Sequence, residues 1–374
     1  MPTYDAIVLG AGGVGTAAMF HLARRGQRVL GIDRFSPGHD RGSSHGESRI
    51  IRQAYFEHPN YVPLLRTAYE LWHEVETLTR QQLLFPVGLL QIGPPDGVVI
   101  PGVIRSAMRH RLKIEELTLR EVDQRFPAFH VPPGCTAVFE PQAGYLLVEE
   151  CVRAHAELAR QQGAELHCDE HVVAWSVSGS GVEVRTDRAV YSAGRLIITA
   201  GAWAGELLGE LGIPLRVLRK HLYWYATTGT AFSAARRAPT FLYELPHGIF
   251  YGFPELHAGE IKLGEHSGGS VVSDPSHDDR QPEMHDRQRV DAFVTDCLAQ
   301  ATNVVRQATC FYTMSPDEHF IVDQYPAAAQ VVFAAGLSGH GFKFVPVLGQ
   351  LLADLALDGR SALPAEFLIA RRFR

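Results

Sequence analysis

The glycine-rich segment GAGGVG at residues 10–15 lies between an apolar run and a helical pattern. The preceding residues, 4–9, read as a buried strand, and the following residues, 16–26, place small and apolar side chains at helical spacing. A second apolar strand is expected over residues 28–33. The segment therefore connects a strand to a helix within a strand–helix–strand unit, rather than forming an isolated turn.

Gly10, Gly12 and Gly15 match the GxGxxG pattern of dinucleotide-binding folds. In that pattern the glycines allow a tight turn, a close approach of the backbone to a pyrophosphate, and close packing of the helix, whose N-terminus attracts phosphates. The second strand ends in Asp33, where a carboxylate can accept a hydrogen bond from an adenosine ribose hydroxyl. These features predict a Rossmann-like nucleotide-binding domain, but they do not distinguish NAD from FAD.

Two later segments repeat the order of strand, small-residue turn and helix. Residues 195–208, RLIITAGAWAGELL, and residues 331–357, which contain AAGLSGHGFKF, place glycines directly after an apolar strand. Large flavin domains use such additional close backbone approaches, and the amides that begin the last helix could face a ring carbonyl or a carboxylate. We therefore expect one nucleotide domain that is assembled from separated parts of the chain.

The length and the order of these units predict two interleaved domains. A chain of 374 residues is too long for one core of ordinary size, and its segment from Leu215 to Ser315 is dominated by strands. The expected fold is α/β, with a Rossmann-like nucleotide-binding domain and a smaller substrate domain on a mixed, mostly antiparallel sheet. The nucleotide-binding domain is expected to comprise residues 1–82, 143–214 and 316–374, and the substrate or catalytic domain residues 83–142 and 215–315.

Charge and cysteine content exclude several classes of function. A net charge of -6 and the lack of a lysine- or arginine-rich block argue against nucleic acid as a partner. The first residues show neither a basic segment nor an apolar run long enough for a signal peptide or membrane span, so a cytoplasmic protein without membrane partners is expected. The five cysteines are scattered without CxxC spacing, which fits reduced thiols.

Three patterns predict helices outside the nucleotide unit. An amphipathic helix over residues 63–78 would place Trp72 in a core, and a further helix is expected over residues 103–111. Thr118 and Glu121 have the spacing of a capping box for a short helix. The polar segment 273–288 contains histidines and aspartates, but it is expected to be a solvated loop without a metal because its spacing matches no known ligand set.

The segment EIKLGEH reads as a strand with chemistry on one face. Alternation places Lys262, Gly264 and His266 together, while the two aliphatic residues point to the other side. A cation and an imidazole would then flank a gap. A surface strand with a polar outer face explains this segment equally well.

The segment TCFYTM has the same alternation. Cys310 and Tyr312 share one face of the expected strand, and Phe311 points away. A sulfur and a phenol are therefore presented together. Taken alone, Cys310 is better explained as a small buried hydrophobic residue.

Two cationic segments point to an anionic ligand. Arg49 and Arg52 lie three residues apart in SRIIRQAY, which is expected to be helical with Ser48 as its cap, and their apolar neighbours imply partial burial that requires a partner. Lys343 lies between two phenylalanines just after a glycine turn, an unfavourable place for a solvated lysine. Surface placement is the alternative for the arginines.

These residues resemble one known family over almost the whole chain. The sequence is similar to the monomeric sarcosine oxidase and N-methyltryptophan oxidase family, within the D-amino-acid-oxidase-like FAD-dependent oxidoreductases. The resemblance is carried by GAGGVG, by GSSHGESRIIRQAY with YVPLL, by FYGFP with KLGEH, by CFYTMSPDEHFIVD and by GLSGHGFKF. It implies FAD bound covalently through its 8α-methyl group to a cysteine, and the matching residue is Cys310.

The resemblance also assigns roles to the site residues. The implied catalytic residues are Lys262, which would promote oxygen reduction, Arg49 and His45 close to the flavin ring, and Tyr312 and His266. The implied substrate-binding residues are Arg52 and Lys343, which would bind the carboxylate, with Tyr251, His266 and Tyr312. The expected cofactor-binding residues are Gly10, Gly12, Gly13, Gly15, Asp33, Arg34, Ser43, His45, Ser48, Arg49, Cys310, Gly339, Gly341, Phe342 and Lys343. Ser44, Glu47 and Ser48 depart from the family pattern GSHHGDTR, which has His, Asp and Thr there.

The implied reaction is the oxidation of an N-methyl amino acid to an imine, which water converts to formaldehyde and the primary amino acid, while oxygen becomes hydrogen peroxide. The partners would be a small amino acid and oxygen, and the protein is expected to be a monomer. An oxidase or dehydrogenase of D-amino acids, glycine, pipecolate or fructosyl amino acids is the nearest alternative. A noncatalytic nucleotide-binding subunit is an alternative from another class. The sequence does not rank sarcosine against N-methyltryptophan.

Overall fold

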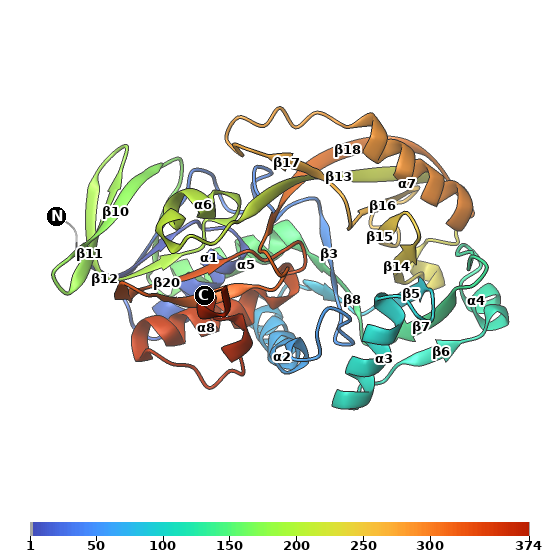
Figure 1. Cartoon of the computed structure of the whole chain (residues 1–374), viewed down its shortest axis with the longest axis horizontal. Helices are drawn as coiled ribbons and strands as arrows, with labels where there is room; N and C mark the ends of the chain where they lie inside the picture. The colour runs from blue at the N-terminus through green and yellow to red at the C-terminus, as the bar shows by residue number, and fades with distance from the viewer. Residues whose placement is uncertain (1–2, 374) are drawn as a thin grey trace.

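The computed structural model describes residues 3–373, and its strands form three sheets (Figure 1). The strands of the first, eight-stranded sheet are β1 (Thr3–Leu9), β2 (Val29–Ile32), β9 (Glu165–His167), β10 (Val172–Ser178), β11 (Gly181–Thr186), β12 (Val190–Ile198), β19 (Ile321–Tyr325) and β20 (Ala328–Ala335). Its centre, β12-β1-β2-β9, is parallel, and β20 also runs parallel to β12. Segments from both ends of the chain and its middle thus form one Rossmann-like sheet.

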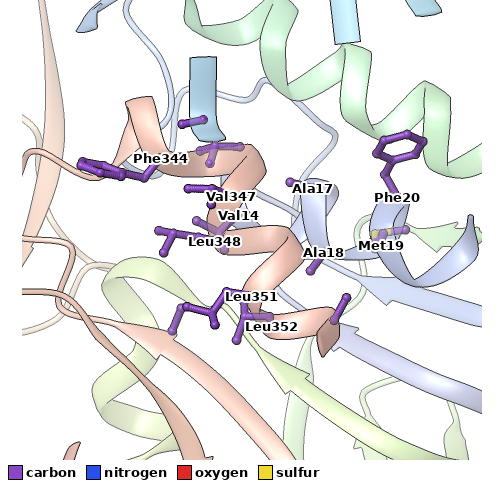
Figure 2. Close-up of a cluster of buried hydrophobic side chains, with 14 of the residues drawn as sticks. Val14, Ala17, Ala18, Met19, Phe20, Phe344, Val347, Leu348, Leu351 and Leu352 are labelled. Atoms are coloured by element: carbon purple, nitrogen blue, oxygen red, sulfur yellow. The ribbon is translucent and has the colours of Figure 1, made fainter. Parts of the chain in front are cut away.

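Three helices pack together on this sheet: α1 (Gly13–Ala23), α5 (Val148–Gln161) and α8 (Val345–Asp358). Every residue of α1 is buried, and its small side chains meet the leucines of α8 (Figure 2). The two helices approach closely because residue 349 is glycine: a Cβ atom at Gly349 would lie 2.6 Å from the Ala17 backbone carbonyl carbon. This packing fixes α1, and with it the glycine turn that precedes the helix.

The second sheet has nine strands and is antiparallel except where β5 pairs with β14. Its strands are β5 (Leu89–Gly93), β6 (Glu115–Leu117), β7 (Thr136–Glu140), β13 (Arg216–Thr227), β14 (Thr240–Leu245), β15 (Gly248–Gly252), β16 (Glu260–Glu265), β17 (Ser270–Val272) and β18 (Ala301–Met314). The expected α/β fold with a mixed, mostly antiparallel second sheet is confirmed. The residue boundaries of the two domains stay a prediction.

A small third sheet corrects one expectation. It consists of β3 (Ser48–Ile51), β8 (Gly144–Leu147) and β4 (Leu84–Phe85). The segment around Arg49 and Arg52 is therefore not a helix capped by Ser48, because its residues pair with β8, with Ser48 opposite Leu147. The arginine spacing suggested a helix, but β-branched residues favour a strand where a partner strand is available.

The remaining helices agree with the sequence in part. Helix α2 (Tyr61–Thr79) and the capping box of α4 (Leu119–Arg125) are confirmed, Trp72 is buried, and the expected helix at 103–111 is α3 (Val99–His110). Helix α7 (Met284–Cys297) was not predicted, and it begins inside the segment that was expected to be a loop. No helix within residues 3–373 is long and apolar enough to cross a membrane.

Candidate active site

A large cavity lies at the carboxyl ends of the parallel strands β1, β2, β12 and β20, where nucleotide ligands bind in such sheets. Its empty volume is about 1410 Å³, which includes space that is open to solvent. The turns at Thr199–Trp203 and Ala334–Gly339 line it beside the GAGGVG turn, so the three strand-turn-helix units meet here as predicted. The expected cofactor-binding residues that line it are Gly10, Gly12, Gly13, Asp33, Arg34, Ser43, Arg49, Gly339, Gly341 and Phe342.

The glycine turn is shaped for a close ligand. Gly12 faces open space, since a Cβ atom there would meet no neighbour within 4 Å. By contrast, a Cβ atom at Gly10, which has φ 89°, would lie 2.6 Å from the Thr199 carbonyl oxygen. Gly15 lies inside α1, and a side chain there would collide with the Gly10 carbonyl oxygen. Gly12 thus borders the cavity, while Gly10 and Gly15 permit the packing around it.

The carboxylate of Asp33 supports the same turn. It accepts hydrogen bonds from the backbone N–H of Ala11 at 2.7 Å and of Phe35 at 2.9 Å. Helix α1 begins at Gly13 with no side-chain cap among the described residues, so its first amides are available to an anion. The cavity, the uncapped helix and the open face of Gly12 together fit a dinucleotide.

A second cavity of about 550 Å³ adjoins the first, because Arg49, Tyr312, Gly339 and Phe342 line both. All five residues that were expected to bind substrate line this smaller cavity: Arg52, Tyr251, His266, Tyr312 and Lys343. Tyr251 lies on β15 and Tyr312 on β18, Arg52 and His266 directly follow β3 and β16, and Lys343 lies in a short 3-10 helix, η4 (Phe342–Phe344), that precedes α8. The structure therefore brings together side chains that are far apart in the sequence.

Arg52 already has an anionic partner in this cavity. Its guanidinium group donates to the two carboxylate oxygens of Glu57 at 2.6 and 2.7 Å, and it stacks over the rings of Tyr55 and Phe56. Burial is the largest single effect and would raise the pKa of Glu57, but the charge and hydrogen bonds of Arg52, together with the charges of His340 and Lys343, lower that pKa to about 2. The sequence implied that Arg52 needs a partner, but it did not identify Glu57.

Lys343 is the second cation of the smaller cavity. Its Nζ donates to the carbonyl oxygen of His340 at 2.8 Å and lies 5.2 Å from the centre of the Tyr55 ring. Burial, reinforced by the nearby charge of Arg52, lowers the pKa of Lys343 to about 7. A carboxylate placed between Lys343 and Arg52 would receive donors from both.

His266 and Tyr312 also line the smaller cavity. The Nδ1 atom of His266 lies 3.5 Å from the Tyr312 hydroxyl. Burial lowers the pKa of His266 to about 3, so the imidazole is neutral near pH 7. The ring of Tyr312 occupies the space in front of Gly339, which has φ 79° and could not carry a side chain without a collision. His266 and Tyr312 thus add uncharged polar groups to a cavity that Arg49, Arg52 and Lys343 also line.

Lys262 is buried, with 2% of its surface exposed, so the alternative of a solvent-facing strand is wrong. Its Nζ donates to the carbonyl oxygens of Gly46 and Ser48 and to the Ser48 hydroxyl. The same Nζ lies 4.7 Å from the centre of the Phe253 ring. Burial, together with the charge of Arg49, lowers the pKa of Lys262 well below its usual value. Lys262 lies beside the cavities and lines neither of them.

Arg49 lies in β3, and His45 lies on the segment that precedes this strand. Arg49 donates to the carbonyl oxygens of Ser43 at 2.7 Å and Ser48 at 2.8 Å. His45 is 4% exposed, and its Nε2 has no hydrogen-bond partner among the described residues. Burial and the charge of Arg49 lower the pKa of His45 to about 3. An unpartnered polar atom at this depth fits a ligand group that completes the site.

Cys310 is fully buried on β18, opposite Lys220 of β13. It packs in a cluster with Leu222, Tyr251 and Tyr312, so the predicted common face of Cys310 and Tyr312 is confirmed. The neighbouring residue Phe311 lines the large cavity, whereas Cys310 lines neither cavity. The structure places the sulfur close to the site, and the attachment of a flavin to it stays a prediction.

Sequence reasoning missed Glu57 and His340, which line the smaller cavity. His340 lies inside the motif GLSGHGFKF, and its ring nitrogen Nδ1 shares a 2.5 Å hydrogen bond with the Tyr55 hydroxyl. Glu57 is five residues beyond Arg52 and gave no periodic signal. The requirement that a buried arginine have an anion nearby could have indicated it.

Comparisons with known proteins agree with this geometry. Residues 5–355 match the family model described as FAD dependent oxidoreductase. The chain is 42% identical to a monomeric sarcosine oxidase of Streptomyces avermitilis, with 99% of this chain and 98% of that protein aligned. It is 37% identical to an N-methyl-L-tryptophan oxidase of Yersinia pestis, with 99% of this chain and 100% of that protein aligned.

Solved structures show the same fold. NikD, an unusual amino acid oxidase essential for nikkomycin biosynthesis, has a TM-score of 0.88 and 25% identity, covering 99% of this chain and 98% of that one. L-proline dehydrogenase from P. horikoshii has a TM-score of 0.85 and 22% identity, covering 100% and 98%. Because the family model spans most of the chain and both relatives align over nearly all of it, the protein belongs to the FAD-dependent oxidoreductases, in the family of sarcosine oxidase and N-methyltryptophan oxidase.

Proposed function

We propose that this protein oxidises N-methyl amino acids such as sarcosine or N-methyltryptophan, and forms the demethylated amino acid, formaldehyde and hydrogen peroxide. The observation that carries the proposal is the pair of joined cavities. Arg52 and Lys343 line the smaller one, which meets the larger one at Arg49 and Tyr312. The names of the aligned relatives support the same class of substrate.

The protein's part is to bind and orient the substrate. Bound FAD would supply the redox chemistry, taking electrons from the substrate and passing them to oxygen. Arg52 offers a planar fork and Lys343 a point charge, and together they would fix the substrate carboxylate. Tyr251, His266 and Tyr312 would then set the position of the amine end.

The cations of the cavity would also favour a neutral amine. Arg49, Arg52 and Lys343 line one small space, so a bound ammonium group would be repelled and its pKa would fall. The amine must lose its proton before it can be oxidised. Activity should therefore rise with pH until the bound amine is neutral.

FAD would occupy the larger cavity, with its phosphates at the glycine turn and the start of α1, and we propose that it is attached through its 8α-methyl group to Cys310. In support, Cys310 is buried in the cluster that contains Tyr251 and Tyr312, next to the junction of the cavities. We also propose a monomer that acts in the cytoplasm, where its five unbridged cysteines would stay reduced.

Anaerobic bleaching of the flavin tests this function. The purified yellow protein is mixed without oxygen with sarcosine, N-methyltryptophan, D-amino acids, glycine, pipecolate and fructosyl amino acids. Rapid bleaching by an N-methyl amino acid, followed by formaldehyde and peroxide formation in air, is the expected result. Bleaching only by another class on the panel would replace the proposed substrate, and a colourless protein that binds no flavin would contradict the function altogether.

A further inference from the structure

A glutamate holds the turn that precedes strand β3. The carboxylate of Glu149, in the first turn of α5, accepts hydrogen bonds from the backbone N–H of Gly46 at 2.6 Å and of Glu47 at 3.0 Å. Both turn residues have left-handed backbones, with φ 88° and 71°, which costs free energy for the non-glycine residue Glu47. The peptide units of this turn present the carbonyl oxygens of Gly46 and Ser48 to Lys262.

A second glutamate holds the turn that follows the same strand. The carboxylate of Glu140, at the end of β7, accepts from the backbone N–H of Gln53 at 2.7 Å and of Ala54 at 3.2 Å. The carbonyl oxygen of Ala54 in turn accepts from Arg52 at 3.2 Å. Glu140 is 2% exposed, and burial raises its pKa to about 7. A carboxylate in such a place is costly, which calls for a function that offsets the cost.

The two glutamates lie on either side of β8, the strand that pairs with β3. Strand β8 runs from Gly144 to Leu147, and Ser48 to Ile51 of β3 lie opposite it in antiparallel register. Glu149 therefore reaches one end of β3 and Glu140 the other. One short segment of chain, residues 140–149, fixes both turns that hold the buried cations.

We propose that Glu149 and Glu140 are positioning residues with separate tasks: Glu149 places Lys262 for the reaction with oxygen, and Glu140 places Arg52 for binding of the substrate carboxylate. The assignment of the two cations rests on the proposed function. Neither glutamate lines either of the two cavities described above, so each would act through the peptide units that it holds. A glutamate that merely stabilised the fold would affect both cations alike. We expect instead that Glu149 affects only Lys262 and that Glu140 affects only Arg52.

The test compares Glu149→Gln and Glu140→Gln with the control Glu150→Gln. Glu150 is exposed, lies next to Glu149 in α5 and, within residues 3–373, forms an ion pair with Arg153 alone, at 2.7 Å, so its substitution removes the same charge without touching a turn. Three quantities are measured on the flavin-loaded proteins. They are the rate at which oxygen reoxidises dithionite-reduced enzyme, the dissociation constant of acetate by calorimetry, and hydrogen exchange of the peptides covering residues 43–48 and 52–56.

We expect each glutamine variant to change one quantity and to leave the other unchanged. Glu149→Gln slows reoxidation by about tenfold or more and raises exchange in residues 43–48, while acetate binding stays close to wild type. Glu140→Gln weakens acetate binding by about tenfold or more and raises exchange in residues 52–56, with reoxidation unchanged. Glu150→Gln changes none of these. If a glutamine variant does not fold, the corresponding Glu→Asp variant should show the same separation with a smaller change.

Two outcomes would overturn the proposal. Variants that alter both quantities in parallel would show that the glutamates only support the fold. Variants that alter neither, even though exchange rises locally, would show that the turns do not position the cations. None of the three measurements requires turnover of an amine, so they remain informative if wild-type protein fails to oxidise N-methyl amino acids and the proposed function itself is wrong.

Discussion

Lys262 and Arg49 donate to the same acceptor, the carbonyl oxygen of Ser48, at 2.8 Å in each case. Two buried cations that share one acceptor repel each other, and the charge of Arg49 adds to the effect of burial in lowering the pKa of Lys262. The shared carbonyl supplies negative partial charge to both cations, and the Gly46 carbonyl supplies more to Lys262. The arrangement concentrates positive charge beside the junction of the two cavities.

Replacing Lys262 should separate the two halves of the reaction. Reduction of oxygen begins with superoxide, an anion that is costly to form in an apolar pocket unless a cation is already in place. Lys262→Met is expected to leave anaerobic reduction by substrate largely intact but to slow reoxidation by orders of magnitude, since one such charge is worth about 3 kcal/mol or more. Stopped-flow absorbance measures both steps. Lys113→Met, at an exposed position, is the control, and wild-type reoxidation in Lys262→Met would show that oxygen reacts elsewhere.

The attachment of the flavin depends on one sulfur. Cys310→Ser should release all flavin into the supernatant on acid precipitation, because a serine hydroxyl is far less nucleophilic than a thiolate. The wild-type protein should keep its flavin in the pellet, and peptide mass analysis should place the added mass on the peptide that contains Cys310. Cys297→Ser, a buried cysteine in α7, should behave as wild type. Flavin that is fully extractable from the wild type contradicts the assignment.

Lys343 should make carboxylate binding depend on pH. Its pKa of about 7 in the free protein means that the ammonium form, which attracts a carboxylate, is lost as pH rises through that value. Acetate affinity should then fall by up to about tenfold per pH unit above it. The pKa values of Glu57, His266 and His340, about 2, 3 and 4, keep these groups in one protonation state near pH 7.

Lys343→Met should abolish that pH dependence and weaken acetate binding by tens-fold or more, since losing one desolvated charge costs about 2–5 kcal/mol. Glu140 also has a pKa of about 7, but protonation below that value would loosen its hold on the turn, so it acts in the opposite direction. Calorimetry across pH distinguishes the two. A fall in affinity with rising pH that persists in Lys343→Met would exclude Lys343 as its source.

Glu57 should weaken binding of the substrate carboxylate, because its own carboxylate already accepts hydrogen bonds from Arg52. Glu57→Gln removes this negative charge from the cavity and frees donors of the guanidinium group. Acetate should bind about tenfold more tightly, because a like charge in the same partly solvated site raises the free energy of the bound state by roughly 1–2 kcal/mol. Glu70→Gln, on the exposed side of α2, is the control. Weaker acetate binding in Glu57→Gln would mean that Glu57 orients Arg52 and does not compete for it.

Local patterns in the sequence were sufficient for several features of the site. The spacing of Gly10, Gly12 and Gly15 located the glycine turn, because strand, turn and helix follow one another directly along the chain. Strand alternation correctly grouped Cys310 with Tyr312, since side chains alternate between the faces of any strand. The family motifs then supplied five of the residues that line the smaller cavity, but neither Glu57 nor His340.

Only the tertiary structure decided which distant groups meet. Strand β3 forms because β8 pairs with it, and no periodicity within the arginine segment reveals a partner so far along the chain. Glu57 forms an ion pair with Arg52, and Glu140 and Glu149 accept hydrogen bonds from the two turns that flank β3. Folding buries these charged groups, and a buried charge requires an opposite charge or hydrogen-bond partners. The lowered pKa of Lys343 follows from that burial and from the charge of Arg52, and both arise only when the separated segments come together.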